Sequence, residues 1–211
     1  MPAITFDAAS EAHSTAVTSI TKAHTCSGAN RLLVAFGFVN LGYSVNSITY
    51  NGDALTAIQT ITNATDTIRS FYKIAPATGS NNAVVTFSAA GSGSCIAMES
   101  INGAKQSAQP DATASQTPVS ASPMTTTITI VAPGSWVVIA GRDSSSGGSA
   151  ASTNCTDRGL SQDQLGMFDS GAGQGAGSFG MTMTSGLSIF SNMVSFAPIP
   201  APKHFSAIAA A

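Results

Sequence analysis

The sequence predicts an all-β protein, an antiparallel β-sandwich with jelly-roll-like topology. Apolar and polar residues alternate with a period of two in one segment after another, which is the pattern of strands with one buried face. Gly, Asn, Asp and Pro interrupt these segments at intervals of roughly 8–12 residues, a spacing typical of a sandwich or barrel. No segment repeats apolar residues at helical spacing over three turns, so no helix is expected.

The most apolar predicted strand covers residues 31–39. Large side chains occupy its even positions, which are Leu32, Val34, Phe36 and Phe38. Smaller side chains prevail at its odd positions. Residues that are apolar on both faces favour a central strand covered on both sides.

The other strands expected before residue 102 are separated by turn-forming residues. Asn51-Gly52 lies between two strand-like runs and predicts a type I′ hairpin, because both turn residues must take a positive φ. These strands cover residues 3–6, 18–26, 45–50, 53–58, 67–74, 83–87 and 94–101.

The second half of the chain repeats this style. Residues 102–122 contain Gly103, Pro110 and Pro118 and are expected to form a long connection, of the kind that crosses between sheets in Greek-key and jelly-roll folds. We therefore expect one sandwich over residues 1–197, and any internal boundary should fall near 103–122. The later strands are expected at residues 125–131, 135–141, 153–158, 164–169, 178–184 and 187–196.

Residues 198–211 are expected to form an extended arm. Prolines alternate with other residues from Pro198 to Pro202, which favours polyproline II, and a short apolar tail follows. Two interpretations stay open: a frayed terminus, or an arm that lies on a neighbouring subunit. On the second interpretation the partner-binding side chains belong to the two terminal segments and are Ile4, Phe6, Ile199, Phe205 and Ile208.

The low charge of the chain excludes several function classes. Charged residues are 9% of the 211 residues and the net charge is -2, against about 25% charged residues in an average soluble domain. No basic block is present, which argues against nucleic-acid binding. No apolar run approaches the ~18–20 residues of a membrane helix. The start has neither the charged region nor the apolar region of a signal peptide, so none is expected.

No motif of a cofactor, a metal site or an activated nucleophile is present. His13, His24 and His204 lack the spacing of metal ligands. No Ser lies in a G-x-S-x-G elbow. The glycine-rich run 171–177 lacks the Lys and the following helix of a phosphate loop. We therefore expect no catalytic residue, no cofactor and no bound metal.

A few acidic residues are still candidates for chemistry. Glu99 lies mid-strand and could serve as one carboxylate of a hydrolase, but a strand Glu more often faces solvent. Asp143 and Asp157 lie in predicted loops and could bind Ca²⁺, although turn formation is the commoner role of such residues.

The aromatic residues and the cysteines offer few further candidates. A sugar-binding platform could be built from Trp136, Tyr43, Tyr50 and Tyr72, but Trp136 lies in an apolar strand and is expected in the core. The three cysteines, Cys26, Cys95 and Cys155, do not form a disulfide framework. Cys26 and Cys95 are expected to be small buried apolar residues, and a Cys95–Cys155 bridge stays open.

Several segments resemble a β-sandwich module of tailed-phage virion proteins, which also occurs in bacterial surface proteins. The resemblance covers most of residues 31–196. It rests on RLLVAF from Arg31, VNSITYNGDALT from Val45, FYKIAPATG from Phe71, AVVTF from Ala83, SINGA from Ser100, QPDA from Gln109 and GSWVV from Gly134. The resemblance implies a jelly-roll-like sandwich without enzymatic activity that forms oligomers on a particle surface.

The expected function is therefore that of a non-enzymatic virion protein, a capsid decoration or cement protein assembled in the host cytoplasm. Its expected partners are the major capsid protein and copies of itself, with a trimer as one candidate state. Few charges need to lose water when such a surface packs on another protein. The alternative is a receptor- or carbohydrate-binding module of a tail fibre or adhesin, with its site on loops 40–44, 63–66 and 144–154. A hydrolase on the same scaffold is the least favoured hypothesis.

Overall fold

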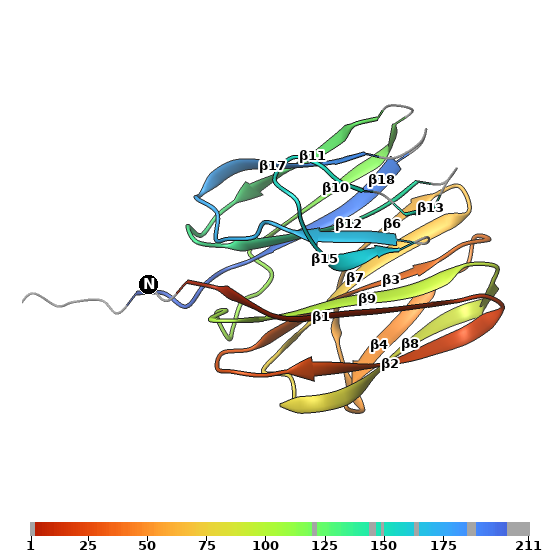
Figure 1. Ribbon diagram of the computed structural model, residues 1–211, viewed down its shortest axis with the longest axis horizontal. Coiled ribbons are helices and arrows are strands. Elements are labelled where there is room, and N and C mark those ends of the chain that lie inside the picture. Colours follow the sequence, from red (N-terminus) through yellow and green to blue (C-terminus); the bar gives the residue numbers. More distant parts are fainter. Residues whose placement is uncertain are drawn as a thin grey trace, which may run out of the picture.

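The computed structural model describes residues 3–119, 122–143, 147–148, 150–162, 165–184 and 189–201. Within these ranges all regular secondary structure is β-structure, and every strand pair is antiparallel. The predicted antiparallel all-β class is therefore confirmed. The strands form four sheets stacked face to face (Figure 1).

The first half of the molecule, residues 3–102, contains two of these sheets. Inner sheet 1 has the order β1-β9-β3-β7-β6, and outer sheet 1 has the order β2-β8-β4-β5. The strands are β1 (Thr5–Ser14), β2 (Val17–Cys26), β3 (Leu32–Val39), β4 (Val45–Tyr50), β5 (Asp53–Ala54), β6 (Thr56–Asn63), β7 (Asp66–Ile74), β8 (Gly79–Gly91) and β9 (Ser94–Asn102).

The second half, residues 112–196, contains the other two sheets. Inner sheet 2 has the order β10-β18-β12-β16-β15, and outer sheet 2 has the order β11-β17-β14. The strands are β10 (Ala112–Val119), β11 (Met124–Ile130), β12 (Trp136–Asp143), β13 (Gly147–Gly148), β14 (Ala150–Ala151), β15 (Thr156–Gln162), β16 (Leu165–Asp169), β17 (Gly177–Thr184) and β18 (Ile189–Phe196).

The two halves share one strand order. Adding nine to each strand number of inner sheet 1 gives the order of inner sheet 2. The same step turns β2-β8 of outer sheet 1 into β11-β17 of outer sheet 2. In both halves the chain crosses several times between the inner and the outer sheet, and the strands at equivalent positions follow the same order, so the second half is a structural repeat of the first.

Three apolar cores separate the four sheets. One core lies between the sheets of the first half, a second between the sheets of the second half, and the third between the two inner sheets. Strand β3 explains this arrangement, because its even residues face the third core and its odd residues face the first. The predicted coverage of this strand on both sides is confirmed, since all eight residues are buried.

Local turn chemistry follows the sequence at the Asn51-Gly52 hairpin. Asn51 has a φ of 52° and Gly52 a φ of 84°, so both residues take the positive φ that the type I′ prediction requires. The turn joins β4 to β5, which pair through Tyr50 and Asp53.

The sequence left open an internal boundary near residues 103–122, and residues 103–111 join the two pairs of facing sheets. One expectation about the elements was wrong. Part of the expected connection 102–122 is strand β10, an edge strand of small residues with Pro118 near its end. Proline is tolerated at a sheet edge, so it did not exclude a strand there.

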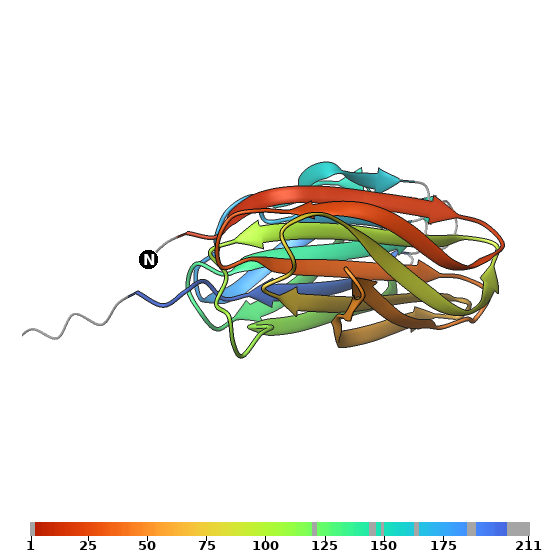
Figure 2. The same ribbon diagram turned by 90° about the horizontal axis from the view of Figure 1, so that it is seen from below.

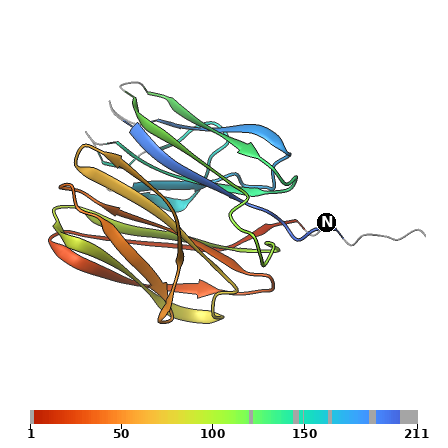
Figure 3. The same cartoon turned by 180° about the vertical axis from the view of Figure 1, so that it is seen from behind.

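The strands run along the long axis of the molecule, and the first and the last segment that the structure describes lie at the same end of it (Figure 2). The segment that joins the halves passes the same end (Figure 3). Gly103 accepts a hydrogen bond from the Ile199 N–H at 3.1 Å, and a Cβ on Gly103 would lie 2.8 Å from the Ala3 carbonyl oxygen. The side chain of Gln109 bonds both backbone groups of Ala197, at 2.9 and 3.0 Å.

Candidate functional site

Several ionisable side chains lie inside the core between the two inner sheets. The strand faces that meet there are otherwise apolar, with residues such as Phe36, Val138 and Val194. Polar residues on a buried face require partners, because an unpaired buried charge is costly. We therefore treat this polar layer as the candidate site.

Glu99 and Asp169 form the centre of the layer, and both side chains are fully buried. Glu99 comes from β9 and accepts a hydrogen bond at 2.7 Å from the indole N–H of Trp136 on β12. Asp169 ends β16 and accepts from Arg158 Nε at 2.7 Å and Nη2 at 3.3 Å, and also from the Gly171 N–H. The Arg158 guanidinium lies 4.3 Å from the ring centre of Phe6.

The protonation of Glu99 follows from these contacts. Burial and the neighbouring Asp169 carboxylate raise the pKa of Glu99 well above its ordinary value. Both causes favour the neutral, protonated form of Glu99. No described residue forms a hydrogen bond with its second oxygen, Oε2. With Glu99 protonated, the group formed by Glu99, Trp136, Asp169 and Arg158 carries no net charge.

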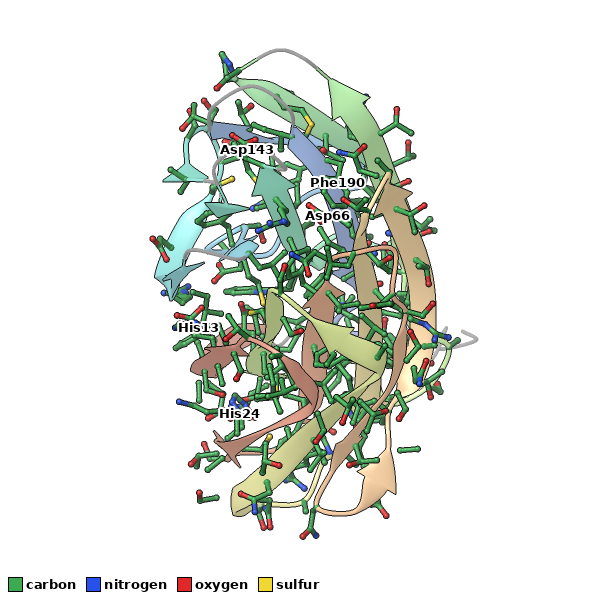
Figure 4. The ribbon with its side chains drawn as sticks, turned by 90° about the vertical axis from the view of Figure 1, so that its right-hand side faces the viewer. His13, His24, Asp66, Asp143 and Phe190 are labelled. Atoms are coloured by element: carbon green, nitrogen blue, oxygen red, sulfur yellow. The ribbon has the colours of Figure 1, made fainter. Side chains whose placement is uncertain are left out.

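A second ion pair crosses the same layer near the other end of the strands. Arg142 on β12 donates from Nε to Asp66 Oδ2 on β7 at 2.8 Å, and its guanidinium lies 4.2 Å from the ring centre of Phe38. Both side chains of the pair are less than one-tenth exposed. Asp66 and Phe190 lie close together in Figure 4, at the level where the two halves meet.

An amide pair completes the contacts between the inner sheets. Gln59 Nε2 on β6 donates to Asn192 Oδ1 on β18 at 2.7 Å, and Asn192 Nδ2 donates to the Gln59 carbonyl at 3.2 Å. The polar layer therefore joins the two halves at three separate places. Its members hold one another, and neither central carboxyl group is accessible to a substrate in this structure.

A second polar cluster lies at the edge of the first half, in the lower part of Figure 4. His24 Nδ1 is 2.8 Å from Ser10 Oγ, while its Nε2 has no partner among the described residues. Burial lowers the pKa of His24 to about 4, so this imidazole is neutral. Asp7 accepts hydrogen bonds from Ser27 and Ser100. Burial alone would raise the pKa of Asp7, but these hydrogen bonds lower it.

An apolar groove of about 310 Å³ opens where the chain ends and the connection between the halves come together. Val131, which follows β11, is 70% exposed at its rim. The groove is lined by Lys105, Ala108, Asp111, Val131, Ala132, Pro133, Ala197, Pro198 and Pro200. The Asp111 carboxylate accepts hydrogen bonds from the N–H groups of residues 131 and 132.

The predicted partner-binding residues occupy different environments. Ile4 is 3% exposed and belongs to the core between the inner sheets, and Phe6 packs against that core. Ile199 is half-buried, and its N–H pairs with Gly103. Phe205 and Ile208 lie outside the described residues. A role of these five residues in binding a partner stays a prediction.

The three acidic residues considered as candidates, Glu99, Asp143 and Asp157, lie in different environments. The expectation that Glu99 faces solvent was wrong, because every residue of β9 except the last is buried. Asp157 does shape a turn, since its Oδ1 accepts from the N–H groups of Gly159 and Leu160. Asp143 is fully buried.

The aromatic candidates do not form a surface platform. Trp136 is in the core, as expected, and Tyr50 is fully buried with its hydroxyl donating to the His24 carbonyl at 3.0 Å. Tyr72 and Tyr43 are half-buried on different cores. Sequence reasoning missed Asp169, Arg158 and Arg142 altogether; charged residues within otherwise apolar strands were the only available signal.

The cysteines are free thiols and form no disulfide with one another. Cys26 and Cys95 are free and buried, which confirms the expectation for both, and Cys155 is free and half-buried. Burial raises the pKa of all three thiols. In the part of the chain that the structure describes, no three His, Cys, Asp or Glu residues gather as metal ligands. The same part contains no helix suited to spanning a membrane.

Comparison with protein-family models, with curated proteins and with solved structures finds no match to this chain.

Proposed function

We propose that the chain is a non-enzymatic structural protein of a tailed-phage virion. In this proposal it acts as a decoration or cement protein, which packs on the capsid shell and on copies of itself. Each half is then one jelly-roll module. Two facing antiparallel sheets between which the chain crosses several times, with the same strand order in both halves, support this assignment.

The observation that carries the proposal is the absence of charge on the described outward faces of both outer sheets. On outer sheet 2, Thr125, Thr127 and Thr129 of β11 are exposed. They lie opposite Thr182, Gly180 and Ser178 of β17. The hydroxyl groups of Thr125 and Thr182 are 2.7 Å apart.

Outer sheet 1 presents a similar surface. Thr21 of β2, Val84 of β8 and Thr49 of β4 are in register across three strands. In the next row the hydroxyl groups of Ser47 and Thr86 are 2.8 Å apart. Both outward faces therefore present hydroxyl and small apolar groups.

Such faces suit contact with other protein. Charged residues are depleted at the cores of protein interfaces, because their desolvation is costly. The ionisable groups of this chain that could do chemistry are instead used to join its two halves. The chain thus resembles a rigid block whose outer surfaces are available for packing.

Immunogold labelling tests the proposal. Antibodies against the purified chain are applied to phage particles induced from the source strain, and the particles are viewed by electron microscopy. Regular labelling of the capsid supports the proposal. Label on tail fibres alone, or on no particle while the free protein is detected, contradicts it.

A receptor- or carbohydrate-binding module is the second candidate, and one observation favours it. The predicted loops 40–44 and 63–66 do meet, since the Gly42 N–H donates to the Thr65 carbonyl at 2.7 Å. Leu41, at the tip, is 51% exposed. A glycan array tests this candidate: specific binding that is lost in Tyr43→Ala and kept in Tyr72→Ala supports it, and the absence of any bound glycan contradicts it.

A further inference from the structure

Strand β11 is an edge strand of outer sheet 2. It pairs with β17 on one side, in unbroken register from Met124 opposite Met183 to Ile130 opposite Gly177. In the described part of the chain no strand pairs with its other side. Strand β10 leads into β11 but pairs with β18 in inner sheet 2. An edge of this kind offers unpaired N–H and C=O groups to another strand.

The groups that point to the open side belong to three threonines. Thr182 of β17 uses its N–H and its C=O on the side away from β11, to Thr153 and Ser152. Opposite residues of an antiparallel pair either exchange both bonds or turn both away from each other. Thr125, opposite Thr182, therefore turns its N–H and C=O to the open side, and by alternation so do Thr127 and Thr129.

This edge lacks the usual protections against pairing. Proteins shield exposed edges with charges, prolines, bulges or short strands. Strand β11 has seven residues, with neither charge nor proline, and its pairing with β17 has no bulge.

The equivalent edge strand of the first half, β2, is shielded. Lys22 of β2 lies on the inward-facing side with Ile20 and His24, a placement that blocks edge pairing. The pairing of β2 with β8 is also bulged between Val17 and Ser19. The contrast between two strands at the same place in one repeated fold singles out β11.

We propose that β11 pairs antiparallel with β11 of a second copy of this chain, with Thr127 of both copies on the two-fold axis. The two Thr127 residues then exchange both backbone hydrogen bonds, and Thr125 of each copy lies opposite Thr129 of the other. Threonine pairs suit such cross-strand positions. The match is self-complementary, as a two-fold contact requires. The proposal specifies the homotypic contact of the proposed structural function and rests on it.

Two substitutions test the pairing by light scattering coupled to gel filtration. The wild-type chain is expected to elute as a dimer, at about twice 21.1 kDa. Thr127→Pro removes an outward N–H while leaving the ladder to β17 intact, because the Thr127 N–H does not face β17. It is expected to weaken dimerisation roughly tenfold or more, since both copies lose a hydrogen bond.

Ser178→Lys is the matched control. It adds a charge to the same outer face, but on β17, one strand away from the proposed contact. This variant is expected to remain dimeric, whereas Thr127→Lys, which brings two charges face to face, dissociates. A monomeric wild type, or dissociation by Ser178→Lys as well as by Thr127→Lys, overturns edge pairing. Far-ultraviolet circular dichroism checks that each variant is folded.

Disulfide trapping gives an independent readout of register. In a Cys155→Ser background, Thr127→Cys places two thiols opposite each other at a Cα separation of about 5.5 Å, within the range of roughly 4.4–6.8 Å that a disulfide spans. Oxidation is expected to link Thr127→Cys chains and not Thr125→Cys chains. Linkage of Thr125→Cys alone would overturn the proposed register.

The two proposals fail in different ways. If the chain dimerises through Thr127 but labels no capsid, the virion function is wrong and the edge pairing stands. If the capsid is labelled equally well by antibody when the phage carries Thr127→Pro, and that protein is dimeric, the edge pairing is wrong and the virion function stands.

Discussion

Glu99 lies in the core between the inner sheets with one hydrogen-bond donor, the indole of Trp136, and one acidic neighbour, Asp169. Its burial could not be predicted, because alternation identifies two faces of a strand but not what covers each. The neighbours Met98 and Ser100 gave no sign that β9 is covered on both sides. The contact with Asp169 depends on how the two halves pack, which no local pattern encodes.

The pH dependence of stability should report the proton on Glu99. The folded state keeps this proton to a higher pH than the unfolded chain, which releases it above about pH 4.5. The contribution of Glu99 to the free energy of unfolding should therefore be complete below pH 4.5 and fall as the pH rises through the raised pKa of Glu99, by at most about 1.4 kcal/mol per pH unit. Urea denaturation of wild type and Glu99→Gln measures this. The variant should lose that slope, and an unchanged slope would show that another group is responsible.

His24 should act in the opposite direction. Its pKa is about 4 in the folded state and 6.5 in the unfolded chain. Stability from this residue is therefore complete above pH 6.5 and is lost as the pH falls towards 4, by on the order of 3 kcal/mol in total. The difference in unfolding free energy between wild type and His24→Asn, followed by urea denaturation, should shrink over this interval. A constant difference would mean that His24 takes up its proton equally in both states.

At the scale of elements, the sequence predicts correctly those features that depend on a single strand or a single turn. The apolar strand β3 and the Asn51-Gly52 turn are set by local chemistry. The extent of β1 was underestimated, because its residues 7–14 mix Ala, Ser, Glu and His without clear alternation. Its place in the sheet is fixed by pairing with β9, a contact remote in sequence.

The pair Arg142–Asp66 ties β12 of the second half to β7 of the first, and its loss should destabilise both. Arg142→Met or Asp66→Asn removes one charge of this buried ion pair and should lower the free energy of unfolding by about 3–5 kcal/mol. The double variant should cost less than the sum of the two. Chemical denaturation of the four proteins measures the coupling. Strictly additive effects would show that the ion pair contributes no coupling.

At the scale of the whole molecule, the number of layers was the feature that sequence patterns could not decide. Alternation predicts that a strand has a buried face, but the two inner sheets bury both faces of their central strands. Strands β3, β12 and β18 are fully buried because of this arrangement. Only the two runs of unbroken apolar character, near residues 32–39 and 136–140, hinted at it.

The shared core between the halves should make the whole chain unfold in one transition. Trp136 is the single tryptophan and is 2% exposed within that core, so its fluorescence reports the contact between the halves. Far-ultraviolet circular dichroism reports the strands of both. The two signals should change at the same urea concentration. Loss of the Trp136 signal well before the loss of strand signal would show that the halves separate first.

The hydrogen bonds between Gln109 and Ala197 affect how the chain assembles at high protein concentration. The two halves have one strand order and complementary inner faces. The first half of one chain could therefore pack on the second half of a neighbouring chain, which gives an intertwined, domain-swapped species. The Gln109 amide and the Lys105 N–H both hold the connection against the Ala197 backbone, so that each chain closes on itself. These hydrogen bonds keep the core between the inner sheets within a single chain. Gln109→Ala should therefore increase the fraction of domain-swapped chains after refolding from a concentrated solution.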